Sequence, residues 1–66
     1  MTIFVNGTAH EVPEDITIQN LLIHLSCADC RVAVELNHDI VPRSSYLTQK
    51  LAHGDRVEVV QAIGGG

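Results

Sequence analysis

The fold of this chain is indicated first by the sequence near its beginning, Thr2-Ile3-Phe4-Val5-Asn6-Gly7. Ile3 and Val5 alternate with Phe4, so two apolar side chains point to one face of a strand and the third points to the other. Asn-Gly between two apolar runs favours a type I′ turn, because both central positions of that turn need a positive φ. The sequence therefore predicts a β-hairpin over residues 2–12.

A helix is predicted after the hairpin. Thr17 is of a residue type that caps helices, and apolar side chains follow it at the i, i+3, i+4 and i+7 spacing of one buried stripe. The stripe consists of Ile18, Leu21, Leu22 and Leu25. We expect this helix to pack against the sheet.

Two further segments alternate apolar and polar residues, as half-buried strands do. In each segment the aliphatic side chains on one face are expected to be buried: Val32, Val34 and Leu36 in residues 31–37, and Val57 and Val59 in residues 56–63. Between them we expect a loop at Pro42, and then a short helical turn that contains Tyr46, Leu47 and Leu51 and closes at Gly54-Asp55. The predicted order is ββαβ, a short helical piece, and a last strand. It indicates an α+β fold in which one mixed sheet is covered on one face by a helix.

The composition limits the classes of partner. The chain has 66 residues, which corresponds to one small domain, and its four basic and eight acidic residues give a formal net charge of −4. Affinity for nucleic acid comes largely from Lys and Arg contacts to phosphate, so we expect no nucleic-acid partner. No apolar run approaches the roughly 18 residues of a membrane span. The beginning of the chain shows neither a charged leader nor a cleavage site, and we expect a cytoplasmic protein without a membrane partner.

The two cysteines form a C-x-x-C motif, Cys27-Ala28-Asp29-Cys30, a spacing that can hold zinc or act as a redox pair. A structural zinc site needs four ligands, and His24 with the two cysteines supplies only three. In thioredoxin-like proteins the pair begins a helix, whereas this pair follows the predicted helix. We expect two reduced thiols and no metal site. A metal or redox module is the alternative, which metal analysis of the purified protein would test.

Three apolar residues are predicted to point away from the core. Strand parity places Phe4, Val60 and Ala62 on the outward face of the first and last strands. If these two strands are neighbours, the three side chains form a patch, which we interpret as a partner-docking surface. The alternative is that they are singly exposed apolar residues without a function.

The end of the sequence is the third candidate for function. Ile63 is followed by Gly64, Gly65 and Gly66. Three extended residues reach about 10 Å, and glycine has no side chain to obstruct passage. Such a tail can enter a narrow channel of another enzyme and present its α-carboxylate there. We predict a folded domain of residues 1–63 and a flexible tail of residues 64–66, with a frayed end as the alternative.

Several motifs occur together along the whole chain: Met1-Thr2-Ile3-Phe4-Val5-Asn6-Gly7, Val34-Glu35-Leu36-Asn37, Ile40-Val41-Pro42-Arg43, Gly54-Asp55-Arg56-Val57-Glu58-Val59-Val60 and Gly65-Gly66. The Val-Pro-Arg segment, the Gly-Asp before the last strand and the final Gly-Gly are specific in combination. With these motifs the chain resembles ubiquitin-like proteins, and most closely the ThiS family of sulfur carriers in thiamine biosynthesis. The resemblance implies a ubiquitin-like β-grasp fold.

The resemblance also implies a mechanism. In that family the partner enzyme ThiF uses ATP to adenylate the carboxylate of the last glycine, here Gly66. The acyl-adenylate becomes a thiocarboxylate with sulfur that a cysteine desulfurase delivers from cysteine, and the sulfur passes to thiazole synthase, ThiG. The carrier is then a protein cosubstrate with no bound cofactor, and catalysis belongs to its partners. Gly64 departs from the family, in which this residue is often larger.

Two other functions share this terminal chemistry. The small subunit of molybdopterin synthase also carries a thiocarboxylate, but it is usually longer, and the Val-Pro-Arg segment points away from it. A ubiquitin-like modifier would use the same terminus to form isopeptide bonds with lysines.

Overall fold

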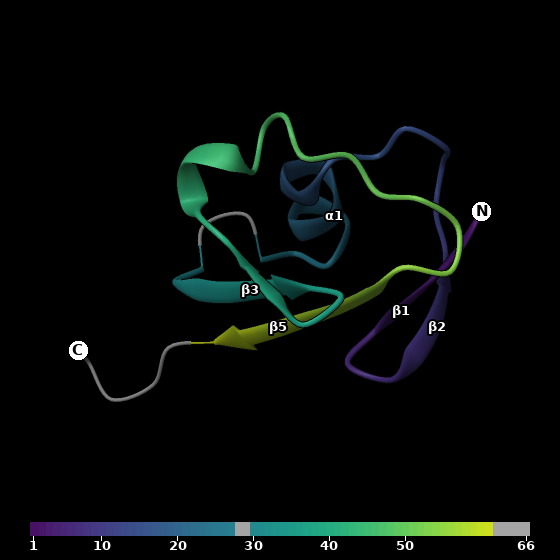
Figure 1. Cartoon of the computed structure of the whole chain (residues 1–66), viewed down its shortest axis with the longest axis horizontal. Helices are drawn as coiled ribbons and strands as arrows, with labels where there is room; N and C mark the ends of the chain where they lie inside the picture. The colour runs from purple at the N-terminus through teal and green to yellow at the C-terminus, as the bar shows by residue number, and fades with distance from the viewer. Residues whose placement is uncertain (28–29, 62–66) are drawn as a thin grey trace.

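The computed structural model describes residues 1–27 and 30–61. Its elements are β1 (Thr2–Val5), β2 (Thr8–Glu11), α1 (Ile18–His24), β3 (Val32–Leu36), β4 (Asp39–Val41), the 3₁₀ helix η1 (Arg43–Ser45) and β5 (Arg56–Gln61). The strands form one sheet in the order β2-β1-β5-β3-β4, and α1 covers one face of it (Figure 1). The predicted α+β class, a mixed sheet with a helix on one face, is confirmed.

The opening hairpin forms as predicted. β1 and β2 pair antiparallel, from Thr2 opposite Glu11 to Val5 opposite Thr8. The two turn residues, Asn6 and Gly7, have φ values of 51° and 83°. Asparagine and glycine are the residue types that enter this left-handed region most readily, which explains why the turn falls there.

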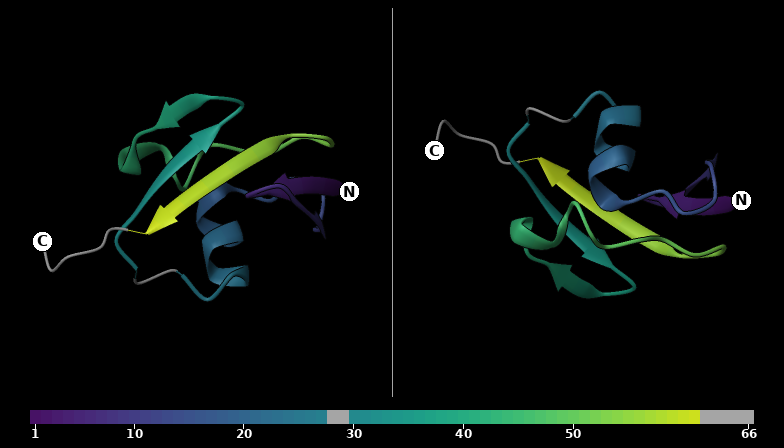
Figure 2. Two further views of the ribbon diagram at one scale, coloured as in Figure 1. Left: turned by 90° about the horizontal axis from the view of Figure 1, so that it is seen from below. Right: turned by 90° about the horizontal axis from the view of Figure 1, so that it is seen from above.

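The centre of the sheet joins the two ends of the described chain. β5 pairs parallel with β1 and antiparallel with β3. Strands that are far apart in the sequence therefore lie side by side, and α1 lies across them (Figure 2). This arrangement satisfies the condition that the predicted docking patch required, because the first and last strands are neighbours.

The helix begins where its sequence predicts. The Thr17 hydroxyl oxygen accepts a hydrogen bond from the Asn20 backbone N–H at 3.2 Å, which caps the first turn. α1 has only seven residues, and no helix among the described residues could span a bilayer. The core combines the buried stripe of α1 with the inward side chains of the sheet and of the connecting loops: Ile3, Val5, Val12, Ile16, Ile18, Leu21, Leu22, Val34, Val41, Tyr46, Leu51 and Val57. Val32, Leu36 and Val59 pack against its edge, as their parity predicted.

The segment between β3 and β5 differs from the prediction in two ways. The predicted order contained no strand at β4, which pairs antiparallel with β3. The hairpin turn before it is made by Asn37 and His38, with φ values of 51° and 74°, and no glycine marks it in the sequence. The helical turn is η1, which begins directly after Pro42, earlier than predicted.

The side chains around this turn explain the error. Tyr46 and Leu51 are buried as expected, but Leu47 is 74% exposed. This segment therefore contacts the core through Tyr46 and Leu51 only, and it does not bury a continuous helical face. For the last strand, the structure describes residues 56–61, and the predicted positions 62 and 63 lie outside the described residues.

Candidate functional site

The candidate site is the surface around the end of β5, the strand that precedes the glycines at the end of the sequence. Gln61, at the end of β5, lies opposite Val32 at the beginning of β3. The N-terminus lies on the other side of the molecule from this end of the sheet (Figure 1). Gly64, Gly65 and Gly66 lie outside the described residues, so the predicted tail remains a prediction. What the structure defines is the surface around the end of β5.

The side chain of Asn6 holds β5 in place beyond its pairing with β1. Backbone pairing between these strands reaches only to Val5 opposite Val57. One residue later, Asn6 Oδ1 accepts a hydrogen bond from the Val59 N–H at 2.9 Å, and Asn6 Nδ2 donates one to the Val59 carbonyl at 3.1 Å. Because β3 pairs with the opposite edge of Val59, through Val34, β5 is held on both edges close to its end. Sequence reasoning identified Asn6 as a turn residue and missed this second role.

We expect Asn6→Gly to loosen β5 without changing the turn. Glycine accepts the positive φ of this position, while both side-chain hydrogen bonds to Val59 are lost. The free energy of unfolding should fall by about 1 to 2 kcal/mol, as two hydrogen bonds of ordinary net value predict. Urea unfolding followed by circular dichroism measures this change, and amide hydrogen exchange at Val59 localises it.

Asn6→Asp is the matched control. It keeps the oxygen that accepts from the Val59 N–H and replaces the donating NH₂ with a second oxygen, so its stability should lie between those of the parent and Asn6→Gly. If Asn6→Gly instead unfolds at the parental urea concentration and the Val59 amide keeps its protection, the side chain does not hold β5.

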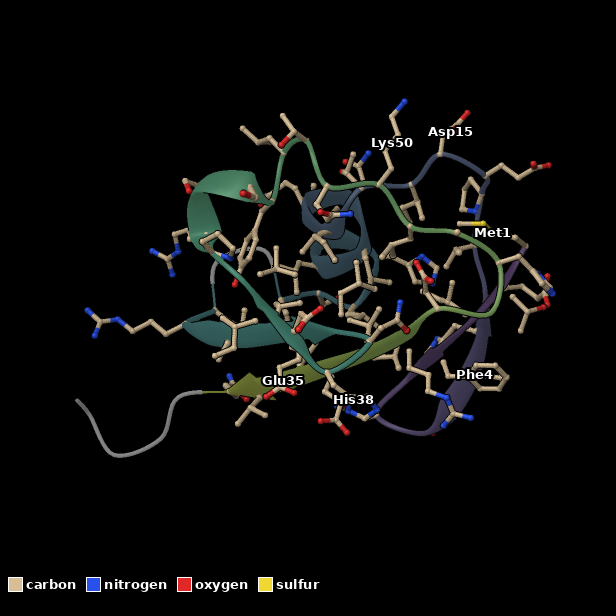
Figure 3. The ribbon with its side chains drawn as sticks, viewed as in Figure 1. Met1, Phe4, Asp15, Glu35, His38 and Lys50 are labelled. Carbon is tan, nitrogen blue, oxygen red and sulfur yellow. The ribbon has the colours of Figure 1, made fainter. Side chains whose placement is uncertain are left out.

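The outward face of the sheet does not join all the predicted docking residues. Phe4 pairs with Arg56 at the beginning of β5, and the Arg56 guanidinium carbon lies 5.8 Å from the centre of the Phe4 ring. Val60, which is 61% exposed, lies four residues further along, with Glu58 between them on the same face. Phe4 is at the β1–β2 end of the molecule, away from the end of β5 (Figure 3). Ala62 lies outside the described residues, and docking through these residues stays a prediction.

Val60 instead shares a groove with two arginines to which the sequence analysis gave no role in docking. A groove of about 430 Å³ is lined by Arg31, Val32, Ala33, Arg43 and Val60. Arg31 and Ala33 alternate with Val32 and Val34, which face the core, so both point outward, but no sequence pattern brings Arg43 to this place. Only the position of η1 beside the beginning of β3 does so.

The cysteines lie at the connection between α1 and β3. Cys27 is half-buried against the core, and the Cys30 N–H donates to the Cys27 carbonyl at 3.1 Å. His24 faces His10, with ring centroids 6.5 Å apart. Within residues 1–27 and 30–61, no three His, Cys, Asp or Glu side chains are grouped so that they could hold a metal ion. The three-ligand set of His24, Cys27 and Cys30 is therefore not assembled among the described residues.

Known proteins match both the sequence and the fold. The ThiS family model matches residues 3–66. A crystal structure of the thiamine biosynthesis protein ThiS from Geobacter metallireducens is similar with a TM-score of 0.86 and 33% identity, over 100% of both chains. Thiazole synthases from Paramagnetospirillum magneticum and Magnetococcus marinus are 39% and 41% identical over 66 residues. This chain spans 20% of the length of each of these two synthases. On this evidence the chain belongs to the ThiS family.

Proposed function

We propose that this chain is a sulfur carrier that provides sulfur for thiazole formation in thiamine biosynthesis. The observation that carries the proposal is the Gly64-Gly65-Gly66 sequence that follows β5 in a chain of the ThiS family. The carboxylate of Gly66 is the site of sulfur attachment, and the other two glycines connect it to the body. The chain acts as a protein cosubstrate, and its partners perform the catalysis.

The chemistry explains why the carrier itself needs no catalytic side chain. A carboxylate is a poor electrophile, so a Gly66 oxygen first attacks the α-phosphorus of ATP, and pyrophosphate leaves. A sulfur nucleophile then attacks the acyl carbon of the adenylate, and AMP leaves. With hydrosulfide as the simplest nucleophile, the products are the thiocarboxylate, AMP and a proton. ATP is thus a substrate of the activating partner, and the carrier holds no cofactor.

Three partners follow from this proposal. A ThiF-type enzyme adenylates the carrier, and a cysteine desulfurase supplies the sulfur. Thiazole synthase, ThiG, accepts it. The thiazole synthases that contain a segment similar to this chain support the last of these, because carrier and acceptor then occur in one polypeptide.

The test of the proposal is the intact mass of the carrier after incubation with a ThiF-type enzyme, ATP and a sulfur source. We expect a mass gain that corresponds to the exchange of one oxygen atom for sulfur, and no gain without ATP. A mass gain on a lysine-containing acceptor protein instead would support the ubiquitin-like modifier. An unchanged mass in the complete reaction would contradict the sulfur-carrier function.

We expect Val60→Asp to weaken binding to the activating enzyme by about 1 to 3 kcal/mol, the range for a residue near the centre of a contact. The cause is a carboxylate placed where an exposed apolar side chain is proposed to be buried against the partner. The melting temperature should change little, because Val60 lies outside the core. Isothermal titration calorimetry and thermal unfolding measure the two effects.

Leu47→Asp provides the control, since Leu47 is also an exposed aliphatic residue but does not line the groove that contains Val60. It should bind as the parent does. If Val60→Asp keeps its affinity, or if Leu47→Asp loses as much, Val60 is not part of the docking surface.

A further inference from the structure

Two of the four basic residues of this acidic chain lie on one groove at the end of β5. Arg31 and Arg43 both line the groove that contains Val60, and both also line a neighbouring hollow of about 400 Å³ that contains Tyr46. The other two, Lys50 and Arg56, do not line either one. With a net charge of −4, the chain would on average attract basic surfaces, so this pair is a local exception.

The fold holds the two arginines at the same end of the molecule. Arg31 directly precedes β3, whose second residue, Ala33, lies opposite Val60. Arg43 is the first residue of η1, and the Tyr46 hydroxyl at the other end of this turn donates a hydrogen bond to the Val32 carbonyl at 3.5 Å. The contact between the end of η1 and the beginning of β3 therefore keeps Arg31 and Arg43 on the groove that contains Val60.

Neither guanidinium group is neutralised by a described carboxylate. The nearest acidic pair on the same face is Glu35 opposite Glu58, two residues further along the strands from Ala33 and Val60. No ion pair joins Arg31 or Arg43 to a carboxylate within residues 1–27 and 30–61. Both side chains are exposed, so they are available to an external group.

We propose that Arg31 and Arg43 bind carboxylate side chains at the entrance of the channel in which the activating enzyme receives the tail. This inference rests on the proposed function, because an enzyme that acts on Gly66 must approach the body around the end of β5. The planar guanidinium group matches a carboxylate with two parallel hydrogen bonds, which sets orientation as well as affinity. Val60, which lines the same groove, supplies the apolar part of the contact, and the arginines supply its polar rim.

The experiment measures the binding of the carrier to the activating enzyme and its adenylation separately. It uses single substitutions that all change the net charge by the same amount. The carrier variants Arg31→Gln, Arg43→Gln and Lys50→Gln each remove one positive charge. Lys50 is the control, because it lies on the opposite side of the molecule from Glu35 and the outward face of the sheet (Figure 3). For each variant, the dissociation constant of its complex with the ThiF homologue of the source organism is measured with and without ATP, at low and at high salt. The KM and kcat of adenylation are measured in a separate assay.

We expect each arginine variant to raise the dissociation constant about 5-fold, and the double variant about 20-fold, without ATP and at low salt. KM should rise by the same factors, kcat should stay at the parental value, and high salt should reduce the difference from the parent. Lys50→Gln should bind as the parent does.

Several outcomes overturn the proposal. One is an equal loss in Lys50→Gln, which would show a dependence on net charge alone. Another is a loss seen only when ATP is present, which would assign the arginines to the phosphates of the nucleotide. Parental binding of both arginine variants also overturns it. If the parent binds but gains no sulfur, the proposed function fails while the binding comparison still decides the role of the arginines. If the parent does not bind, both proposals fail.

Discussion

Deletion of Gly66 should abolish the ATP-dependent gain of sulfur and leave the melting temperature unchanged. The deletion moves the terminal carboxylate back by roughly 3.5 Å, the length of one extended residue, so it no longer reaches the α-phosphorus of the partner's nucleotide. The fold should survive, because the buried core of the described residues extends only from Ile3 to Val57. Intact mass spectrometry after the complete reaction measures the first effect, and thermal unfolding measures the second.

The companion variant appends one alanine after Gly66. Its carboxylate belongs to a residue with a side chain, which must pass a channel that the proposal reserves for glycine. We expect no mass gain from this variant either. A variant with Gly64→Ala is the control, since the residue before the Gly-Gly pair is often larger in the family, and it should be converted at a rate near that of the parent. If the deleted or the extended variant gains sulfur at the parental rate, the acceptor is not the Gly66 carboxylate.

The predictable parts of the fold are those in which a short stretch of sequence is enough to decide the local structure. The positive φ values of Asn6 and Gly7 follow from an Asn-Gly turn, and the spacing of the apolar residues after Thr17 predicts the buried face of α1. β4 escaped prediction for two physical reasons. It has only three residues, too few to show a period of two, and its turn uses Asn37 and His38 in the left-handed region without a glycine.

The candidate site was predictable only in part, because sequence parity gives the direction of a side chain but not its neighbours. Parity placed Phe4 and Val60 on one face, which the structure confirms, but the register of β1 against β5 separates them along the strands. The two features that the sequence did not indicate both join distant parts of the chain. The Asn6 side chain bonds to Val59, 53 residues away, and Arg43 lines the same groove as Val60 because of where η1 lies.

Replacement of Leu21 by alanine should unfold much of the protein at 37 °C. Leu21 is fully buried, and α1 is the layer that covers the inner face of the sheet. Loss of a buried leucine side chain costs about 2 to 5 kcal/mol, whereas the core of a domain this small rarely supplies more than about 3 to 5 kcal/mol of net stability. Circular dichroism and the dispersion of amide signals in NMR spectra measure the folded fraction.

The same variant also tests whether the folded body matters for sulfur transfer, because its Gly66 is intact. We expect conversion to the thiocarboxylate to fall in proportion to the folded fraction, since the docking surface around Val60 exists only when β3 and β5 are paired. Ile23→Ala is the control on the same helix. Its side chain is 55% exposed, so stability and conversion should both stay near parental values. If the unfolded Leu21→Ala chain is converted as fast as the parent, the activating enzyme recognises the tail alone, and the surface at the end of β5 has no part in docking.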